Sequence, residues 1–250
     1  MQFSTAKEII SHMESMRNET QRQGLMRFFK TGKGDYGEGD EFLGLKVPQT
    51  RVIVKQISHL PLEAVPELLN NRYHEIRLCG FLVLVKYFER LTTKRLHDDA
   101  KAIGQRDAIV GMYLNHADCA NNWDLVDLSA PRILGHWLML PTQLGDKRAI
   151  VDALAMSDNL WRQRISMVCT WMTNRLGDPS WCLRYAEMHL QHPHDLMPKA
   201  VGWMLREMGK HNGMDLLRDF LHKHAHHMPR TTLRYAIERM PDDERKRWMQ

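Results

Sequence analysis

The chain has 250 residues, of which 43% are hydrophobic and 26% are charged, a balance that excludes an intrinsically disordered protein. No apolar run approaches the roughly 18 to 20 residues that a membrane-spanning helix needs, and the N-terminus lacks a secretory hydrophobic core, so we expect a cytoplasmic protein. The net charge of +5 is a modest excess that favours a polyanionic partner if the basic residues cluster.

Cysteine and histidine usage gives no strong metal signature. The four cysteines are scattered without a CxxC pair, which is typical of buried thiols in a reducing compartment. The run "HKHAHH" at residues 222–227 has no acidic partner within it, and no HExxH is present. A GxxxxGK[ST] phosphate loop is also missing. We therefore predict no metal and no small-molecule cofactor.

Helical patterns dominate the chain from its N-terminus onward. A glycine-rich loop is expected over residues 30–42, and Pro48 is expected in the first turn of the helix that follows it. Further along come helices with apolar residues over much of their circumference, as inner helices have. They are expected over residues 75–88, 123–138, 161–172 and 199–209. Pro131 should end or kink the second of these helices.

Functional residue types recur with a period of about forty residues. Asp127, Arg164 and Trp203 are spaced by 37 and 39 positions. Helix pairs with this period indicate an all-α, HEAT-like solenoid, with an irregular helical bundle as the alternative. We predict one repeat domain over residues 1–250, with N-terminal helices and the loop to about 48 and repeats over about 49–241. In such a fold, equivalent positions of successive repeats line one concave groove, here a basic one.

Trp123 and Asp127 are four positions apart in "NNWDLVDLSAP", so a helix places them on one face. An asparagine of the pair 121–122 can cap this helix, and Asp124 can interact with the amides of its first turn. Capping does not account for Asp127, one turn further on. Beside Trp123 it would face a positive centre, or it would form a salt bridge with Arg164.

Lys199, Trp203, Arg206 and Lys210 follow the spacing of one helical stripe. Basic residues interleaved with an aromatic one suit a phosphate backbone and a stacking platform. The alternative is a solvated face with a partly buried tryptophan.

A second basic group lies at the start of a helix. Residues 157–159, "SDN", form an expected N-cap, and Arg162 and Arg164 follow in the first turns. Two arginines beside exposed helix N–H groups would suit a bound phosphate. Alternatively, these arginines pair with acids of a neighbouring repeat.

Taken in order, several stretches resemble the AlkD family of bacterial DNA alkylation-repair glycosylases over about Phe42 to Pro241. They are "FLGLKVPQTR", "NNWDLVDLSAPRILG", "LWRQRIS", "KAVGWMLRE" and "RTTLRYAIERMP". The resemblance implies an all-helical HEAT-like fold. It also implies Trp123 and Trp203 as site aromatics, Asp127 as the essential carboxylate and Arg164 as a DNA contact.

From the resemblance we expect a monomeric DNA glycosylase that removes cationic N3- or N7-alkylated purines from duplex DNA and works near the bacterial nucleoid. Asp127, Trp123 and Trp203 would carry the chemistry. Arg162, Arg164, Lys199, Arg206 and Lys210 would bind DNA. The alternatives are a non-catalytic binder of damaged or branched DNA and a HEAT-type protein scaffold.

Overall fold

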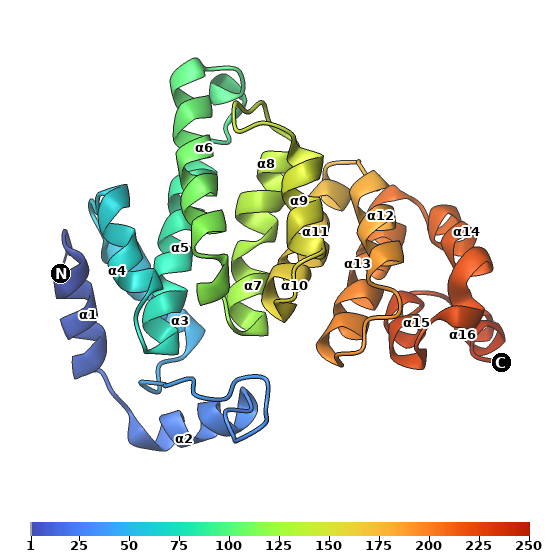
Figure 1. Ribbon diagram of the computed structural model, residues 1–250, viewed down its shortest axis with the longest axis horizontal. Coiled ribbons are helices and arrows are strands. Elements are labelled where there is room, and N and C mark those ends of the chain that lie inside the picture. The colour runs from blue at the N-terminus through green and yellow to red at the C-terminus, as the bar shows by residue number, and fades with distance from the viewer. Residues whose placement is uncertain (1) are drawn as a thin grey trace. The chain divides into compact units, whose positions relative to one another are not determined.

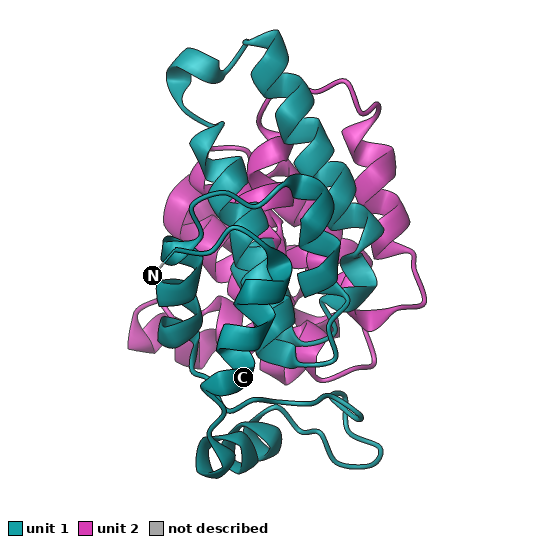
Figure 2. Ribbon diagram, turned by 90° about the vertical axis from the view of Figure 1, so that its left-hand side faces the viewer, with its two compact units in different colours: residues 1–129 teal, residues 130–250 magenta. Residues whose placement is uncertain are grey.

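The computed structural model describes residues 2–250, and its regular structure is helical (Figure 1). Within that range, β-structure is limited to two isolated bridges, Phe3 with Ile57 and Glu41 with Tyr73. The all-α fold expected from the sequence is therefore confirmed. The chain forms two compact units, Met1–Ser129 and Ala130–Gln250, coloured separately in Figure 2. The single repeat domain over residues 1–250 stays a prediction.

The first unit is built around a long central helix. Its helices are α1 (Ala6–Ser15), α2 (Glu19–Phe28), α3 (Val47–Gln56), α4 (Val65–Leu69), α5 (His74–Arg90), α6 (Ala100–Asn115) and α7 (Trp123–Ser129). Helix α5 packs against α3, α4, α6 and α7, and its side chains from His74 to Val85 are all buried. The inner helix expected over residues 75–88 is confirmed.

The segment that precedes α3 is held in place by one buried carboxylate. Glu75 accepts hydrogen bonds from the backbone N–H groups of Leu43 (2.8 Å), Gly44 (2.8 Å) and Leu45 (3.0 Å). Gly44 has a φ of +93°, and a Cβ there would lie 2.1 Å from the carbonyl oxygen of Asn18, so glycine is required. Upstream, residues 30–42 contain no helix, and Pro48 lies in the first turn of α3, both as expected.

The second unit is also organised around one long helix. Its helices are α8 (His136–Leu138), α9 (Lys147–Ala155), α10 (Leu160–Val168), α11 (Thr170–Arg175), α12 (Ser180–Met188), α13 (Leu196–Asn212), α14 (Met214–His224), α15 (Arg230–Ala236) and α16 (Asp242–Trp248). Helix α13 packs against α10, α11, α12, α14 and α15. Val201, Leu205 and Met208 are fully buried, so the apolar face expected opposite the basic stripe is confirmed. Successive helices pack as pairs, α4 with α5 and α9 with α10, as in helical-repeat proteins.

Two of the expected helices are interrupted. Helix α7 ends at Ser129, whose hydroxyl donates to the carbonyl of Leu125 at 2.5 Å, and a π-helical turn Pro131–Gly135 leads into α8. Proline lacks the N–H that a continuing α-helix needs, so the interruption expected at Pro131 is confirmed. The helix expected over residues 161–172 is divided at Cys169, where the backbone stays helical (φ −58°, ψ −27°).

Three of the four cysteines, Cys79, Cys169 and Cys182, are buried thiols, as expected, while Cys119 is half-buried. Burial raises the pKa of the Cys79 thiol to about 12 and that of Cys182 to about 11. These thiols are therefore unreactive packing groups. Across residues 2–250, no helix combines the length and hydrophobicity needed to cross a bilayer.

Candidate functional site

Helix α7 presents an aromatic ring and a carboxylate, one turn apart, to a cavity in the first unit. Trp123 and Asp127 are both half-buried, and both line this cavity of about 490 Å³. The side chain of Asn122 accepts the N–H of Trp123 at 2.9 Å, so an asparagine does serve the start of the helix. Asp127 is thus neither sealed in the core nor on a fully exposed surface. The expected juxtaposition of ring and acid is present.

Phenylalanine rings that the sequence analysis missed complete the cavity wall. Phe29 stacks on Phe42 with ring centroids 5.3 Å apart, and it lies 5.4 Å from the ring of Trp123. Phe28 meets Trp123 edge to face at 5.7 Å, although 61% of Phe28 is exposed. The only sequence signal was that these phenylalanines flank the glycine-rich loop, which brings the end of α2 and the start of the next segment together.

A buried charge network lies directly behind the cavity. The His74 ring, 2% exposed, bonds the carboxylate of Asp40 through Nδ1 (2.8 Å) and that of Asp124 through Nε2 (2.9 Å). These two carboxylates outweigh the cost of burial and raise the pKa of His74 to about 9. The imidazole is therefore a cation at neutral pH, and it donates to both acids.

Arg77 extends this network toward the start of α7. It pairs with Asp40 and donates to the side chain of Asn121 at 2.9 Å. Hydrogen bonds and the charges of Arg77 and His74 lower the pKa of the Asp40 carboxyl, against the effect of its burial. Asp124 was expected to interact with first-turn amides, but its Oδ2 atom bonds His74 instead.

These contacts assign different tasks to the two acids of α7. Asp124 is buried and tied to the cationic His74, so it fixes the position of the helix. Asp127 is half-buried and lines the aromatic-walled cavity beside Trp123, whereas the other lining carboxylates, Glu75 and Asp124, are buried in hydrogen bonds. A carboxylate in a poorly solvated, aromatic-walled site interacts strongly with any positive charge that enters, because little water screens it.

The arginines expected to bind phosphate lie on α10 in the second unit. Asn159 caps this helix by accepting the N–H groups of Trp161 (2.8 Å) and Arg162 (3.2 Å), which confirms the expected N-cap. Arg162 is half-buried. Arg164 is only 5% exposed and donates to the carbonyl of Leu196, at the start of α13, at 2.8 Å. Arg164 thus ties α10 to α13.

The predicted basic stripe on α13, which runs from Lys199 to Lys210, is exposed to solvent at both ends. Lys199 and Lys210 are exposed, and Trp203 and Arg206 are half-buried between them. Acids lie among these bases: Arg206 pairs with Glu238 from beyond the helix, and Lys210 lies 3.6 Å from Glu207. Lys199 is therefore the more available base for a phosphate, whereas a phosphate at Arg206 would have to displace Glu238.

The structure thus brings Trp123 together with Asp127 in one unit, and Arg164 together with the helix of Trp203 in the other. A groove shared by both sets stays a prediction.

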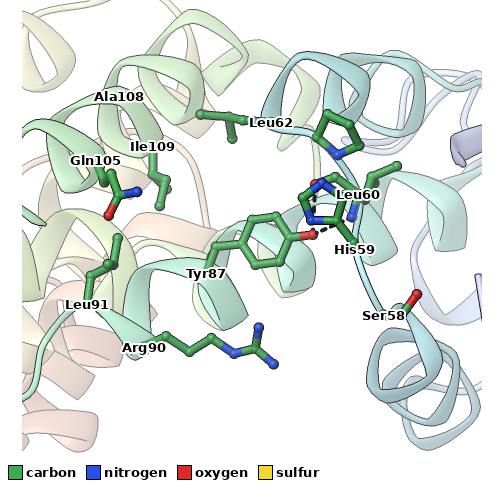
Figure 3. Close-up of a pocket in the computed structure, with 11 residues that line it drawn as sticks. Ser58, His59, Leu60, Leu62, Tyr87, Arg90, Leu91, Gln105, Ala108 and Ile109 are labelled. Atoms are coloured by element: carbon green, nitrogen blue, oxygen red, sulfur yellow. Dashed lines mark hydrogen bonds between the residues drawn. The ribbon is translucent and has the colours of Figure 1, made fainter. Parts of the chain in front are cut away.

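Another cavity in the first unit, of about 340 Å³, lacks the features of a reaction site. Figure 3 shows the Tyr87 ring in it, with its hydroxyl accepting the N–H of Leu60 (3.0 Å) and donating to the Leu60 carbonyl (2.9 Å). Leucine, proline, alanine and isoleucine side chains form much of its lining, and no carboxylate is among the lining residues.

Two histidines of the run 222–227 contact aromatic rings of the second unit. His222 lies 4.9 Å from the ring of Trp248, and His224 lies 4.5 Å from that of Phe220. Among residues 2–250, no group of three or more histidine, cysteine or acidic side chains is arranged to hold a metal ion.

The packing of helix pairs defines an all-α helical-repeat protein. Residues 9–240 match the family model described as DNA alkylation repair enzyme, and the chain belongs to this family. Its fold is similar to that of a solved structure described as a predicted DNA alkylation repair enzyme from Enterococcus faecalis. That likeness has a TM-score of 0.62 and covers 91% of this chain and 98% of the other, at 12% sequence identity. No curated protein sequence gives a significant match. Family membership supports an enzyme that acts in DNA alkylation repair.

Proposed function

We propose that the protein is a DNA glycosylase that hydrolyses the N-glycosidic bond of cationic N3- or N7-alkylated purines in duplex DNA. The observation that carries this proposal is Asp127, a half-buried carboxylate that lines an aromatic-walled cavity beside Trp123. Membership of the DNA alkylation repair enzyme family supplies the class of substrate.

The residue types suit a substrate that already carries positive charge. An N3- or N7-alkylated purine is a cation, so when the bond from C1′ to the purine nitrogen breaks, the electron pair leaves on a neutral base. This departure needs no general acid. The positive charge passes to the deoxyribose as an oxocarbenium ion, as in sugar hydrolysis.

Asp127 would act on that sugar cation. Its carboxylate would stabilise the oxocarbenium ion and position a water molecule, whose oxygen bonds C1′ while its proton passes through the carboxylate to solvent. One preorganised electrostatic group of this kind typically contributes about a hundred- to thousandfold in rate. Trp123 and Trp203 would contact the sugar through their ring faces, each contributing about 1 to 2 kcal/mol when desolvated.

Basic side chains of the second unit would hold the duplex. We assign phosphate contacts to Lys199, Lys210 and Arg206 on α13 and to Arg162 on α10. Arg164, also assigned as a phosphate contact, is 5% exposed and would have to leave the Leu196 carbonyl to reach a phosphate. Such contacts fix register without reading sequence. The proposed enzyme acts as a monomer and requires neither a metal nor a nucleotide.

The test is incubation of the purified protein with duplex DNA that contains a single 7-methylguanine. We expect release of the free base and an alkali-labile abasic site, with no release from the same duplex carrying guanine. Binding of the methylated duplex without base release would instead identify a non-catalytic DNA binder. Absence of salt-sensitive binding would indicate a protein scaffold.

A further inference from the structure

Two arginines from separate segments converge on one tyrosine in the first unit. Arg17 lies in the turn between α1 and α2, Arg72 lies just before α5, and Tyr73 is the N-cap residue of α5. Arg17 donates to the Tyr73 hydroxyl oxygen at 3.2 Å, and Arg72 donates to the same oxygen. The two guanidinium carbons lie 5.4 and 4.5 Å from the centre of the Tyr73 ring.

This arrangement concentrates positive charge without a balancing acid. Both arginines are exposed, and within residues 2–250 neither forms an ion pair. The Tyr73 oxygen uses its lone pairs to accept two guanidinium donors, so its own proton needs another acceptor, which the described residues do not provide. The cluster therefore offers two cations and a hydroxyl donor to an external anion.

The cluster is also held in place by the backbone around it. The N–H of Tyr73 donates to the side chain of Asn71 at 3.0 Å, and the carbonyl of Arg72 accepts from Arg77 at 2.9 Å. Tyr73 itself is only 4% exposed and forms a bridge with Glu41. A site fixed in this way loses little conformational entropy when a ligand binds.

Guanidinium groups match the oxygen geometry of phosphate, to which they donate paired, charge-assisted hydrogen bonds. We propose that Arg17, Arg72 and Tyr73 form a binding site for one backbone phosphate of duplex DNA, separate from the cavity of Trp123 and Asp127. The proposal rests on the proposed function in one respect, namely that duplex DNA is the partner. Such a contact positions the first unit on DNA and is independent of the lesion.

The test is the salt dependence of binding to an undamaged duplex. Because each neutralised phosphate contributes about 0.9 to the slope of log K against log salt, R17Q/R72Q should reduce that slope by about 0.9. The matched control is R90Q/R95Q, which removes the same charge from exposed arginines of the same unit and should leave the slope unchanged. Tyr73→Phe should weaken binding without changing the slope, because it removes a donor but no charge.

The assignment would be overturned if R17Q/R72Q retained the wild-type salt slope. It would also be overturned if R90Q/R95Q reduced the salt slope as much as R17Q/R72Q does. Titration with inorganic phosphate, followed by NMR of the arginine side chains, separates a free anion from a DNA phosphate. Phosphate binding that depends on Arg17 and Arg72, together with an unchanged DNA slope, would identify a site for free anions and contradict the proposal. Base release from methylated duplex is measured separately, so its failure would remove the glycosylase function and leave the phosphate site standing.

Discussion

The charge of His74 makes the stability of the first unit depend on pH in a defined direction. Its pKa is raised from 6.5 to about 9 by Asp124 and Asp40, so the folded protein holds a proton that the unfolded chain releases between these values. The stabilisation is fully present below pH 6.5 and is lost as the pH rises through 9. One such proton corresponds to about 1.4 kcal/mol for each pH unit, or about 3 kcal/mol in total.

The assay is urea unfolding followed by circular dichroism at several pH values between 6.5 and 8. This window avoids His189, whose pKa burial lowers to about 4 and whose effect on stability is confined below pH 6.5, in the opposite sense. The wild type should lose about 2 kcal/mol of unfolding free energy across the window. His74→Gln should be destabilised by about 3 kcal/mol or more at pH 7, because it leaves the buried carboxylate of Asp124 without its cation, and it should lack this pH dependence.

A direct measurement on the wild type covers the case in which His74→Gln does not fold. In ¹⁵N NMR of the histidine rings, one buried imidazole should remain doubly protonated at pH 8. The reasoning is refuted if every histidine is neutral at that pH, or if the variant shows the same fall in stability as the wild type.

Other perturbations test the packing and the proposed DNA contacts. Gly202→Ala should destabilise the second unit by about 1 to 3 kcal/mol in thermal unfolding, because its Cβ would lie 2.5 Å from the carbonyl oxygen of Thr232 and backbone must shift. In the native protein a thiol reagent should modify Cys119 first, and the buried cysteines should react only after denaturation; early reaction of all four would contradict their burial. Lys199→Gln should lower the salt slope of duplex binding by about 0.9, whereas Arg206→Gln should lower it less because Arg206 already pairs with Glu238. Equal slopes for the two variants would count against this ranking.

The helical fold and one side of the cavity could be predicted from local patterns. Apolar spacing predicted the inner helices α5 and α13, and the absence of an N–H in Pro131 predicted the end of α7. The four-residue spacing of Trp123 and Asp127 placed them on one helix face. Each of these features depends on residues within a few turns of one another, which periodicity captures.

The buried ion pairs of His74 behind the cavity could not be predicted from periodicity. His74 meets Asp40 and Asp124 across 34 and 50 positions of sequence. No periodic pattern links residues so far apart, and histidine has no preference that would mark it as a buried cation. The same applies to the stack of Phe29 on Phe42, which only the closure of the loop brings together.

The pairing of Arg206 with Glu238 also could not be predicted from helical spacing. Helical spacing placed Arg206 on the stripe with Lys199, but its acid partner comes from beyond α13, 32 positions further along. A stripe of bases on one helix therefore overstates the positive charge of the surface, because an acid from a later segment of the chain pairs with one of them.

The most direct test of the account is the single-turnover rate of 7-methylguanine release by Asp127→Asn. We predict a fall of about a hundred- to thousandfold, with duplex affinity unchanged. The exposed acid Glu67, changed to glutamine as the matched control, should leave the rate at its wild-type value. Excision by Asp127→Asn at the wild-type rate would show that the carboxylate beside Trp123 does not act on the sugar, and the proposed mechanism would be wrong.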